Sequence, residues 1–127
     1  MTVAIADTTV VIHLYRRYSP ALTWYGSLSQ PLDVTPITWL EVMYGAGSKA
    51  KRATCKVILS QFNIAYITSI DQDWAIQQME KYRLSHGITT EDCLIASVAH
   101  RLQVPLYRQN IKDISPMIGK LAVQPYV

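Results

Sequence analysis

The chain lacks most of the features that define disulfide-rich, zinc-binding and membrane proteins. Its two cysteines, Cys55 and Cys93, are isolated and show no C-x-x-C spacing. We therefore expect neither a disulfide framework nor a cysteine zinc site, and a reducing cytoplasm is the simplest location. No eighteen consecutive residues are apolar, so no membrane span is predicted. The apolar N-terminus has no basic segment and is interrupted by Asp7, unlike a signal peptide.

Motifs for nucleotide binding and for metal ligation by histidine are also missing. There is no G-x-G-x-x-G, so dinucleotide binding has no support. The segment Gly45–Lys49 lacks the G-x-x-x-x-G-K-[ST] spacing of a phosphate loop and is interpreted as a helix end followed by a turn. His13, His86 and His100 show no paired ligand spacing, and we expect structural or surface roles for them.

The chain does have enough apolar sequence for a folded core. Its 127 residues correspond by length to one domain, predicted to span 1–127, and half of them are apolar. The formal net charge is +3 with only nine acidic residues. This balance fits a polyanionic partner that approaches a locally negative site, although many ordinary soluble proteins have a similar charge.

Short apolar strands alternate with helical patterns along the whole chain. The predicted strands are residues 3–6, 32–35, 64–68 and 104–107, with a possible fifth at 121–123. The predicted helices are residues 8–17, 19–30, 38–45, 49–61, 71–86 and 90–102. This alternation predicts an α/β sandwich around a mainly parallel sheet of four or five short strands.

Four acidic residues lie next to apolar segments and are candidates for one site: Asp7, Glu41, Asp92 and Asp113. Sites in parallel sheets form beyond the carboxyl ends of the strands, and the predicted elements direct all four acids to that edge. Carboxylates gathered in this way repel one another unless a cation offsets their charge, and Mg²⁺ or Mn²⁺ prefers such oxygen ligands. A divalent ion on a small basic protein suggests phosphodiester chemistry.

Each acid also has an ordinary structural explanation. Asp7 can cap the helix that follows it, and Thr38–Glu41 and Thr89–Asp92 each match a capping arrangement. Asp113 can stabilise a polar loop through its side chain. No single acid decides between the two explanations, and the information lies in the set and its order.

Four segments together resemble the PIN-domain ribonucleases, in particular the toxin halves of VapBC-type toxin–antitoxin pairs. They are Ala4–Thr8, Thr38–Gly45, Thr90–Ser97 and Leu106–Ile114, which correspond in order and spacing to the family's acid-bearing motifs over essentially the whole chain. The chain departs from the family pattern at two places. Arg108 stands where a Thr or Ser is frequent, and Ile114 stands in place of the usual Phe.

The resemblance implies a three-layer α/β/α sandwich and a Mg²⁺- or Mn²⁺-dependent endoribonuclease. Asp7, Asp92 and Asp113 would bind the metal, with Glu41 completing the site as a ligand or through water. Thr8 and Asn110 are candidates for orienting the acids, although local capping and loop hydrogen bonds explain them equally well. By the same resemblance, the chain would be a homodimeric toxin that is inhibited by a cognate antitoxin protein.

The RNA contacts expected from the sequence are basic side chains near the acids: Arg16, Arg17 and Arg108. Arg108 has two interpretations, because it can contact phosphate or pair with an acid and weaken metal binding. The second interpretation keeps open a catalytically weakened PIN domain that binds RNA or protein. A phospho-receiver domain is less consistent with the sequence, since Asp7 has no acidic neighbour and the segment 64–68 leads into Ser69-Ile70.

Overall fold

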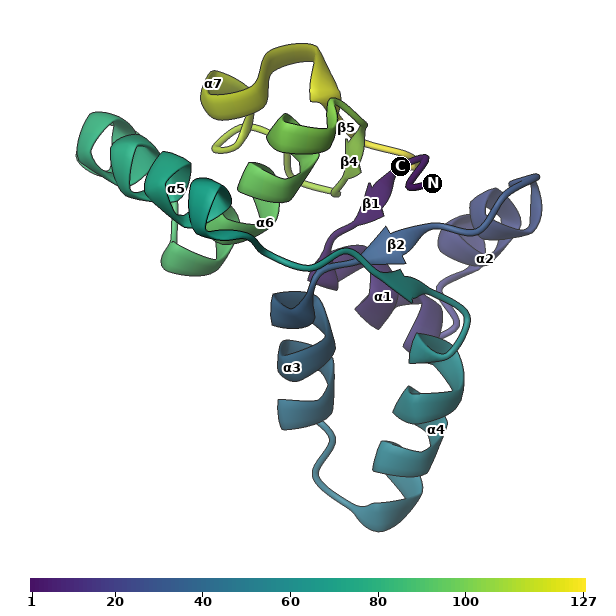
Figure 1. Ribbon diagram of the computed structural model, residues 1–127. Helices are drawn as coiled ribbons and strands as arrows, with labels where there is room; N and C mark the ends of the chain where they lie inside the picture. Colours follow the sequence, from purple (N-terminus) through teal and green to yellow (C-terminus); the bar gives the residue numbers. More distant parts are fainter.

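A central sheet of five short parallel strands organises the computed structural model, which describes residues 1–127 (Figure 1). The strands are β1 (Ile5–Ala6), β2 (Asp33–Val34), β3 (Asn63–Ile64), β4 (Leu106–Tyr107) and β5 (Ala122–Val123). The helices are α1 (Thr8–Tyr15), α2 (Ser19–Gly26), α3 (Pro36–Tyr44), α4 (Lys49–Leu59), α5 (Ser69–Tyr82), α6 (Thr90–Leu102), α7 (Ser115–Ile118) and the short 3-10 helix η1 (Gly119–Leu121). The predicted α/β fold is confirmed, and its sheet is parallel throughout.

The middle strand, β1, is where the winding of the sheet reverses. The strand order is β3-β2-β1-β4-β5, so the chain builds β2 and β3 on one side of β1 and later β4 and β5 on the other. Ligands of open α/β sheets bind outside the carboxyl ends of the strands at such a reversal. Asp7 directly follows β1 and Arg108 directly follows β4, and the backbone N–H of Asp7 donates to the carbonyl of Tyr107 at 3.0 Å.

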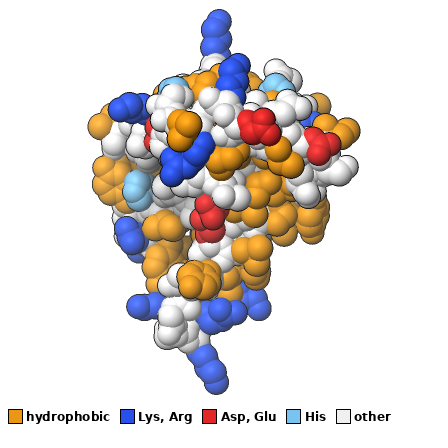
Figure 2. All heavy atoms as spheres, turned by 90° about the vertical axis from the view of Figure 1, so that its left-hand side faces the viewer, with side chains coloured by type: hydrophobic (Ala, Val, Ile, Leu, Met, Phe, Trp, Pro, Cys, Tyr) orange, Lys and Arg blue, Asp and Glu red, His pale blue; other side chains and the backbone are white.

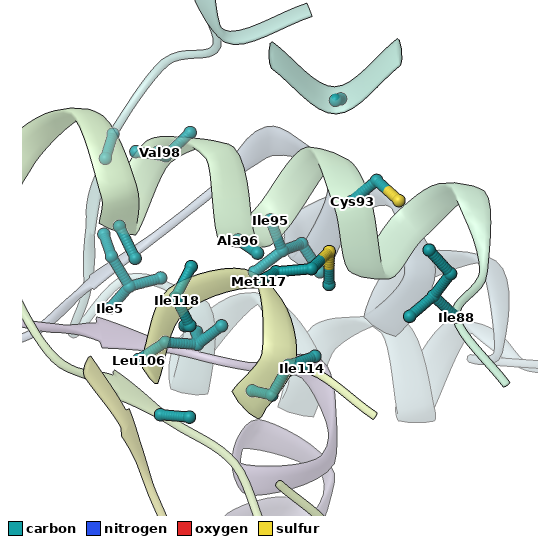
Figure 3. Close-up of a cluster of buried hydrophobic side chains, with 14 residues drawn as sticks. Ile5, Ile88, Cys93, Ile95, Ala96, Val98, Leu106, Ile114, Met117 and Ile118 are labelled. Carbon is teal, nitrogen blue, oxygen red and sulfur yellow. The ribbon is translucent and has the colours of Figure 1, made fainter. Parts of the chain in front are cut away.

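Side chains of β1 alternate between two hydrophobic cores, one on each face of the sheet. Ile5 lies in the core formed with α5, α6 and α7, where Ile95, Leu106 and Ile114 are buried (Figure 3). Ala6 lies in the second core, formed with α1 to α4. Because both faces are covered, the middle strand β1 is a continuous apolar run, and the three layers expected from the resemblance are present.

Several boundaries differ from those predicted. The first helix ends at Tyr15, because Arg17 adopts a left-handed φ of 57°. The long helix α5 ends at Tyr82 and does not reach His86, and only the first residue of the predicted strand 64–68 pairs in the sheet. The short helix α7 was not predicted, since its four residues give too little periodicity to detect. None of the helices has the length and apolar character needed to cross a membrane.

Candidate functional site

Asp7 is fixed by the chain's turn from β1 into α1. It is the N-cap of α1, and its Oδ2 accepts hydrogen bonds from the backbone N–H of Thr9 at 3.3 Å and from the Thr9 hydroxyl at 3.0 Å. The capping explanation considered from the sequence is therefore correct. Both bonds go to the same oxygen, however, and Oδ1 takes no part in the cap. One carboxylate can therefore cap the helix and still present an oxygen to the edge of the sheet.

Asp92 has the same double character at the start of α6. Its Oδ2 accepts from the backbone N–H of Thr89 at 3.1 Å, and its own N–H donates to the Thr89 hydroxyl at 3.1 Å, which completes a capping box. The remaining oxygen, Oδ1, accepts a hydrogen bond from Nη1 of Arg108. This ion pair joins α6 to the end of β4, and both side chains are largely buried.

Glu41 is the acid whose structural explanation from the sequence was wrong. The N-cap of α3 is Thr35 and not Thr38, because Pro36 starts the helix, so Glu41 closes no capping box. Its Oε1 accepts instead from the Thr8 hydroxyl at 2.6 Å, and that hydroxyl lies 3.0 Å from the hydroxyl of Thr38. Thr8 therefore holds Glu41 against the end of β1, beside Asp7.

Asp113 approaches from the loop after β4. Its Oδ1 accepts from the backbone N–H of Gly87 at 3.2 Å, and the side chain is half-buried. A Cβ placed on Gly87 would lie 3.2 Å from Oδ2 of Asp113, so only glycine leaves that carboxylate undisturbed. No local sequence pattern links Gly87 to a residue 26 positions further on.

The charges of these side chains influence one another. Burial is the main cause that raises the pKa of Asp7; Arg108 and Thr9 oppose it, and Asp92 adds to it. Burial also raises the pKa of Glu41 against the Thr8 hydrogen bond, with further increases from Asp7, Glu91 and Asp92.

Arg108 responds to the same cluster with the opposite sign. Burial works to lower the pKa of its guanidinium, but Asp7, Asp92 and Asp113 outweigh burial, and the pKa is raised. The charges of Asp7, Asp92 and Asp113 thus act on one guanidinium, and those of Asp7 and Asp92 also act on Glu41. Figure 2 shows acidic side chains at separate places over the upper part and the middle of the face on which α3 and α5 lie.

A comparison with protein-family models supplies the family. The model of the PIN domain matches residues 4–108. The chain belongs to the PIN-domain family. Among the four acids, Asp113 lies just beyond the matched range. A comparison with curated protein sequences finds no match.

Solved structures with the same fold include chains from toxin–antitoxin complexes and a separately crystallised toxin. A toxin–antitoxin complex from Klebsiella pneumoniae contains a chain with 25% identity and a TM-score of 0.81, covering 97% of this chain and 98% of that one. DNA-bound VapBC from Salmonella typhimurium matches with 18% identity and a TM-score of 0.77, covering 98% of each chain. The sarcin–ricin loop cleaving toxin VapC20 of Mycobacterium tuberculosis matches with 13% identity and a TM-score of 0.71, covering 90% of this chain and 95% of that one.

The PIN family is typically metal-dependent, and the acids of this chain fit a divalent cation by their chemistry. Carboxylate oxygens are the ligands that Mg²⁺ and Mn²⁺ prefer, and Oδ1 of Asp7 is free of the capping bonds. No three Asp, Glu, His or Cys side chains are drawn together as a ready ligand set. Instead, Arg108 supplies the positive charge at Oδ1 of Asp92.

The remaining predicted side chains are distributed unevenly around this cluster. Asn110 is exposed and accepts from the backbone N–H of Lys112 at 3.2 Å, which is the local loop bond and no link to the acids. Arg16 lines a groove of about 350 Å³ together with Glu41 and Lys51. Arg17 lines a different hollow, between α2 and α4, that none of the four acids lines.

Lys51, on α4, was not among the basic side chains expected near the acids. Its place in the same groove as Glu41 follows from the packing of α4 beside α1 and α3. Lysine and arginine side chains gather at the lower end of the face in Figure 2, at the height of the turn that joins α3 to α4 in Figure 1. The groove therefore brings two basic side chains, Arg16 and Lys51, together with one of the four acids, Glu41.

Proposed function

We propose that this PIN-domain protein is a Mg²⁺- or Mn²⁺-dependent endoribonuclease that acts as the toxin of a toxin–antitoxin pair. The observation that supports this most lies at the edge of the sheet where the winding reverses: the charges of Asp7, Asp92 and Asp113 act on Arg108 there, and Thr8, next to Asp7, holds Glu41. These acids come from four separate segments, and helix capping alone does not require them to share one electrostatic environment.

In this proposal, Asp7, Asp92 and Asp113 hold the cation and Glu41 completes its surroundings. A bound divalent ion would lower the pKa of its water toward neutrality, so that hydroxide is available near neutral pH. It would also offset negative charge on the phosphoryl oxygens. The protein's own contribution is to fix the oxygens: the Thr9 bonds orient Asp7, and the Thr8 hydroxyl orients Glu41.

The groove beside Glu41 is suited to the RNA backbone. Arg16 and Lys51 line it together with Glu41, so phosphates bound by these two cations would place a neighbouring phosphodiester near the acids. Such contacts carry no base information, and RNA of any sequence would bind them in a salt-dependent way.

The antitoxin part of the proposal draws on a second groove, along α3. It has a volume of about 800 Å³, and its lining includes Trp39, Leu40 and Tyr44 as well as Glu41 and Glu91. Apolar side chains next to two carboxylates suit an amphipathic protein segment that carries a basic residue. A homodimer is part of the same proposal. An upstream short open reading frame whose product copurifies with this chain would support the pairing.

The test of the catalytic proposal is Asp7→Asn, with Asp73→Asn as a matched control. Asparagine keeps an oxygen for the Thr9 cap but removes the negative charge, whereas Asp73 is exposed on α5. We expect D7N to lose most Mn²⁺-dependent RNA cleavage while it stays folded, and D73N to cleave like the wild type. Cleavage by D7N at the wild-type rate would reject the assignment.

A second candidate function is a PIN domain that binds RNA without efficient cleavage. The Arg108–Asp92 ion pair favours it, because a guanidinium already satisfies a carboxylate that the metal would need. Wild-type protein that binds RNA yet cleaves none of it in millimolar Mn²⁺ would establish this alternative.

A further inference from the structure

The position of Arg108 among the acids is built into the sheet. Its backbone N–H donates to the carbonyl of Val123 at 3.0 Å, which continues the pairing of β4 with β5. From this fixed point the side chain reaches across to Asp92 on α6, and it is largely buried. A long charged side chain ordered and desolvated in this way needs a compensating partner.

The partner oxygen is the one that a metal would use. Oδ2 of Asp92 is engaged by the backbone N–H of Thr89 in the capping box, which leaves Oδ1 as its available oxygen. Nη1 of Arg108 donates to that oxygen. A cation and the guanidinium therefore compete for the same atom, and they cannot both hold it in this arrangement.

A second ion pair of the same chain shows what a permanent bridge looks like. Asp71, like Asp92, is the third residue of a helix inside a threonine capping box. Nε of Arg101 donates to both of its oxygens, at 2.8 and 3.1 Å, and Nη2 donates to the carbonyl of Tyr66 at 3.1 Å. The guanidinium of Arg108 makes only its one bond to Asp92, and its buried Nε has no partner.

This contrast indicates that charge, and not a full set of hydrogen bonds, holds Arg108 in place. The guanidinium contacts Asp92, and the charges of Asp7 and Asp113 also act on it and raise its pKa. A divalent cation brings twice the charge to the same oxygens, and carboxylates are its preferred ligands. Replacement of the Arg108 guanidinium by a divalent cation is therefore favourable at a sufficient metal concentration.

We propose that Arg108 is a resident counter-cation: it occupies the cation position of the acid cluster in the metal-free protein and must leave Asp92 before a divalent ion binds. Arg108 then stabilises the apo fold and sets the metal concentration at which the site fills. This inference rests on the proposed metal site at the same acids, and it assigns Arg108 a role distinct from phosphate binding.

The experiment measures Mn²⁺ binding to RNA-free protein by the loss of the electron paramagnetic resonance signal of free Mn²⁺. The variants are Arg108→Gln, which keeps much of the stem but removes the charge, Arg108→Lys, and the control Arg101→Gln. We expect R108Q to bind Mn²⁺ about 10–100-fold more tightly than wild type, the range typical of changes around metal ligands. The Mn²⁺ affinity of R108K should lie between those of R108Q and the wild type, and R101Q should bind Mn²⁺ like the wild type.

Thermal unfolding gives an independent readout. R108Q should have a lower Tm than wild type without metal, because the acids lose their counter-charge, and a larger rise in Tm when Mn²⁺ is added. If R108Q does not fold without metal, the test uses R108K instead. A higher Mn²⁺ affinity of R108K than of the wild type then supports the inference. Affinity of R108Q or R108K equal to or below that of wild type overturns it while leaving the metal site intact. Absence of Mn²⁺ binding in every variant overturns the metal site itself.

Discussion

Replacing Thr8 with valine removes one hydroxyl from the site and hardly changes the size of the side chain. That hydroxyl donates to Oε1 of Glu41 at 2.6 Å and opposes the rise in the pKa of this carboxyl. A hydrogen bond to a charged group contributes roughly 1.5–3 kcal/mol, and the lower value applies because Glu41 is only partly buried. A loss of about 1.5 kcal/mol corresponds to an approximately tenfold change.

We therefore expect Thr8→Val to lower Mn²⁺-dependent RNA cleavage about tenfold, or to raise the Mn²⁺ concentration for half-maximal cleavage by the same factor. The assay is single-turnover cleavage of a labelled RNA over a Mn²⁺ titration. Thr8→Ser keeps the hydroxyl and should retain activity, and Thr23→Val alters an exposed threonine on α2 as a control. Wild-type kinetics in T8V would show that Thr8 does not position Glu41 for the reaction.

Two further predictions concern other parts of the molecule. Gly87→Ala places a Cβ 3.2 Å from Oδ2 of Asp113, so the carboxylate must shift by a few tenths of an ångström. RNA cleavage should therefore fall about tenfold, with an almost unchanged Tm. Full cleavage activity in this variant would contradict the role of Asp113. Burial, with a smaller effect of Tyr18, raises the pKa of Tyr126 from 10.0 to about 12, so the folded state retains this proton more strongly than the unfolded state. The resulting stability is present below pH 10 and is lost as pH rises toward 12. The difference in unfolding free energy between wild type and Tyr126→Phe should therefore shrink over that range. A constant difference would refute the raised pKa of Tyr126.

The sequence predicted the fold because the signals for it are local. Apolar runs ending at Asp7 and near Arg108 mark inner strands of a parallel sheet, and the alternation with helices leaves few topologies. The reversal of winding at β1 then accounts for acids distant in sequence lying at one edge. Strand lengths and helix ends were less accurate, since single residues such as Arg17 decide them through their backbone conformation.

The acids show why a motif can support two explanations at once. From the sequence, Asp7 and Asp92 were either helix caps or site residues, and the structure shows each capping a helix with one oxygen only. The other oxygen lies outside the cap, and in Asp92 it accepts a hydrogen bond from Arg108. For Glu41 the capping pattern misled, because the Thr35-Pro36 pair starts the helix three residues earlier than the pattern around Thr38 indicates.

Contacts between distant segments were beyond the reach of the sequence. The approach of Gly87 to Asp113 depends on how the loop before α6 packs against the loop after β4. The choice of Arg108 between phosphate and carboxylate was open for the same reason, and the structure shows it on Asp92. Asn110 matched a family motif, yet its hydrogen bond stays within its own loop.

The most direct test of the metal site is a crystal structure of the protein grown in Mn²⁺, with the ion located by its anomalous scattering. The account predicts one or more peaks bonded to oxygens of Asp7, Asp92 and Asp113, with the guanidinium of Arg108 withdrawn from Asp92. A structure at saturating Mn²⁺ with no peak among these acids and Arg108 still on Asp92, from protein that nevertheless cleaves RNA, would contradict it.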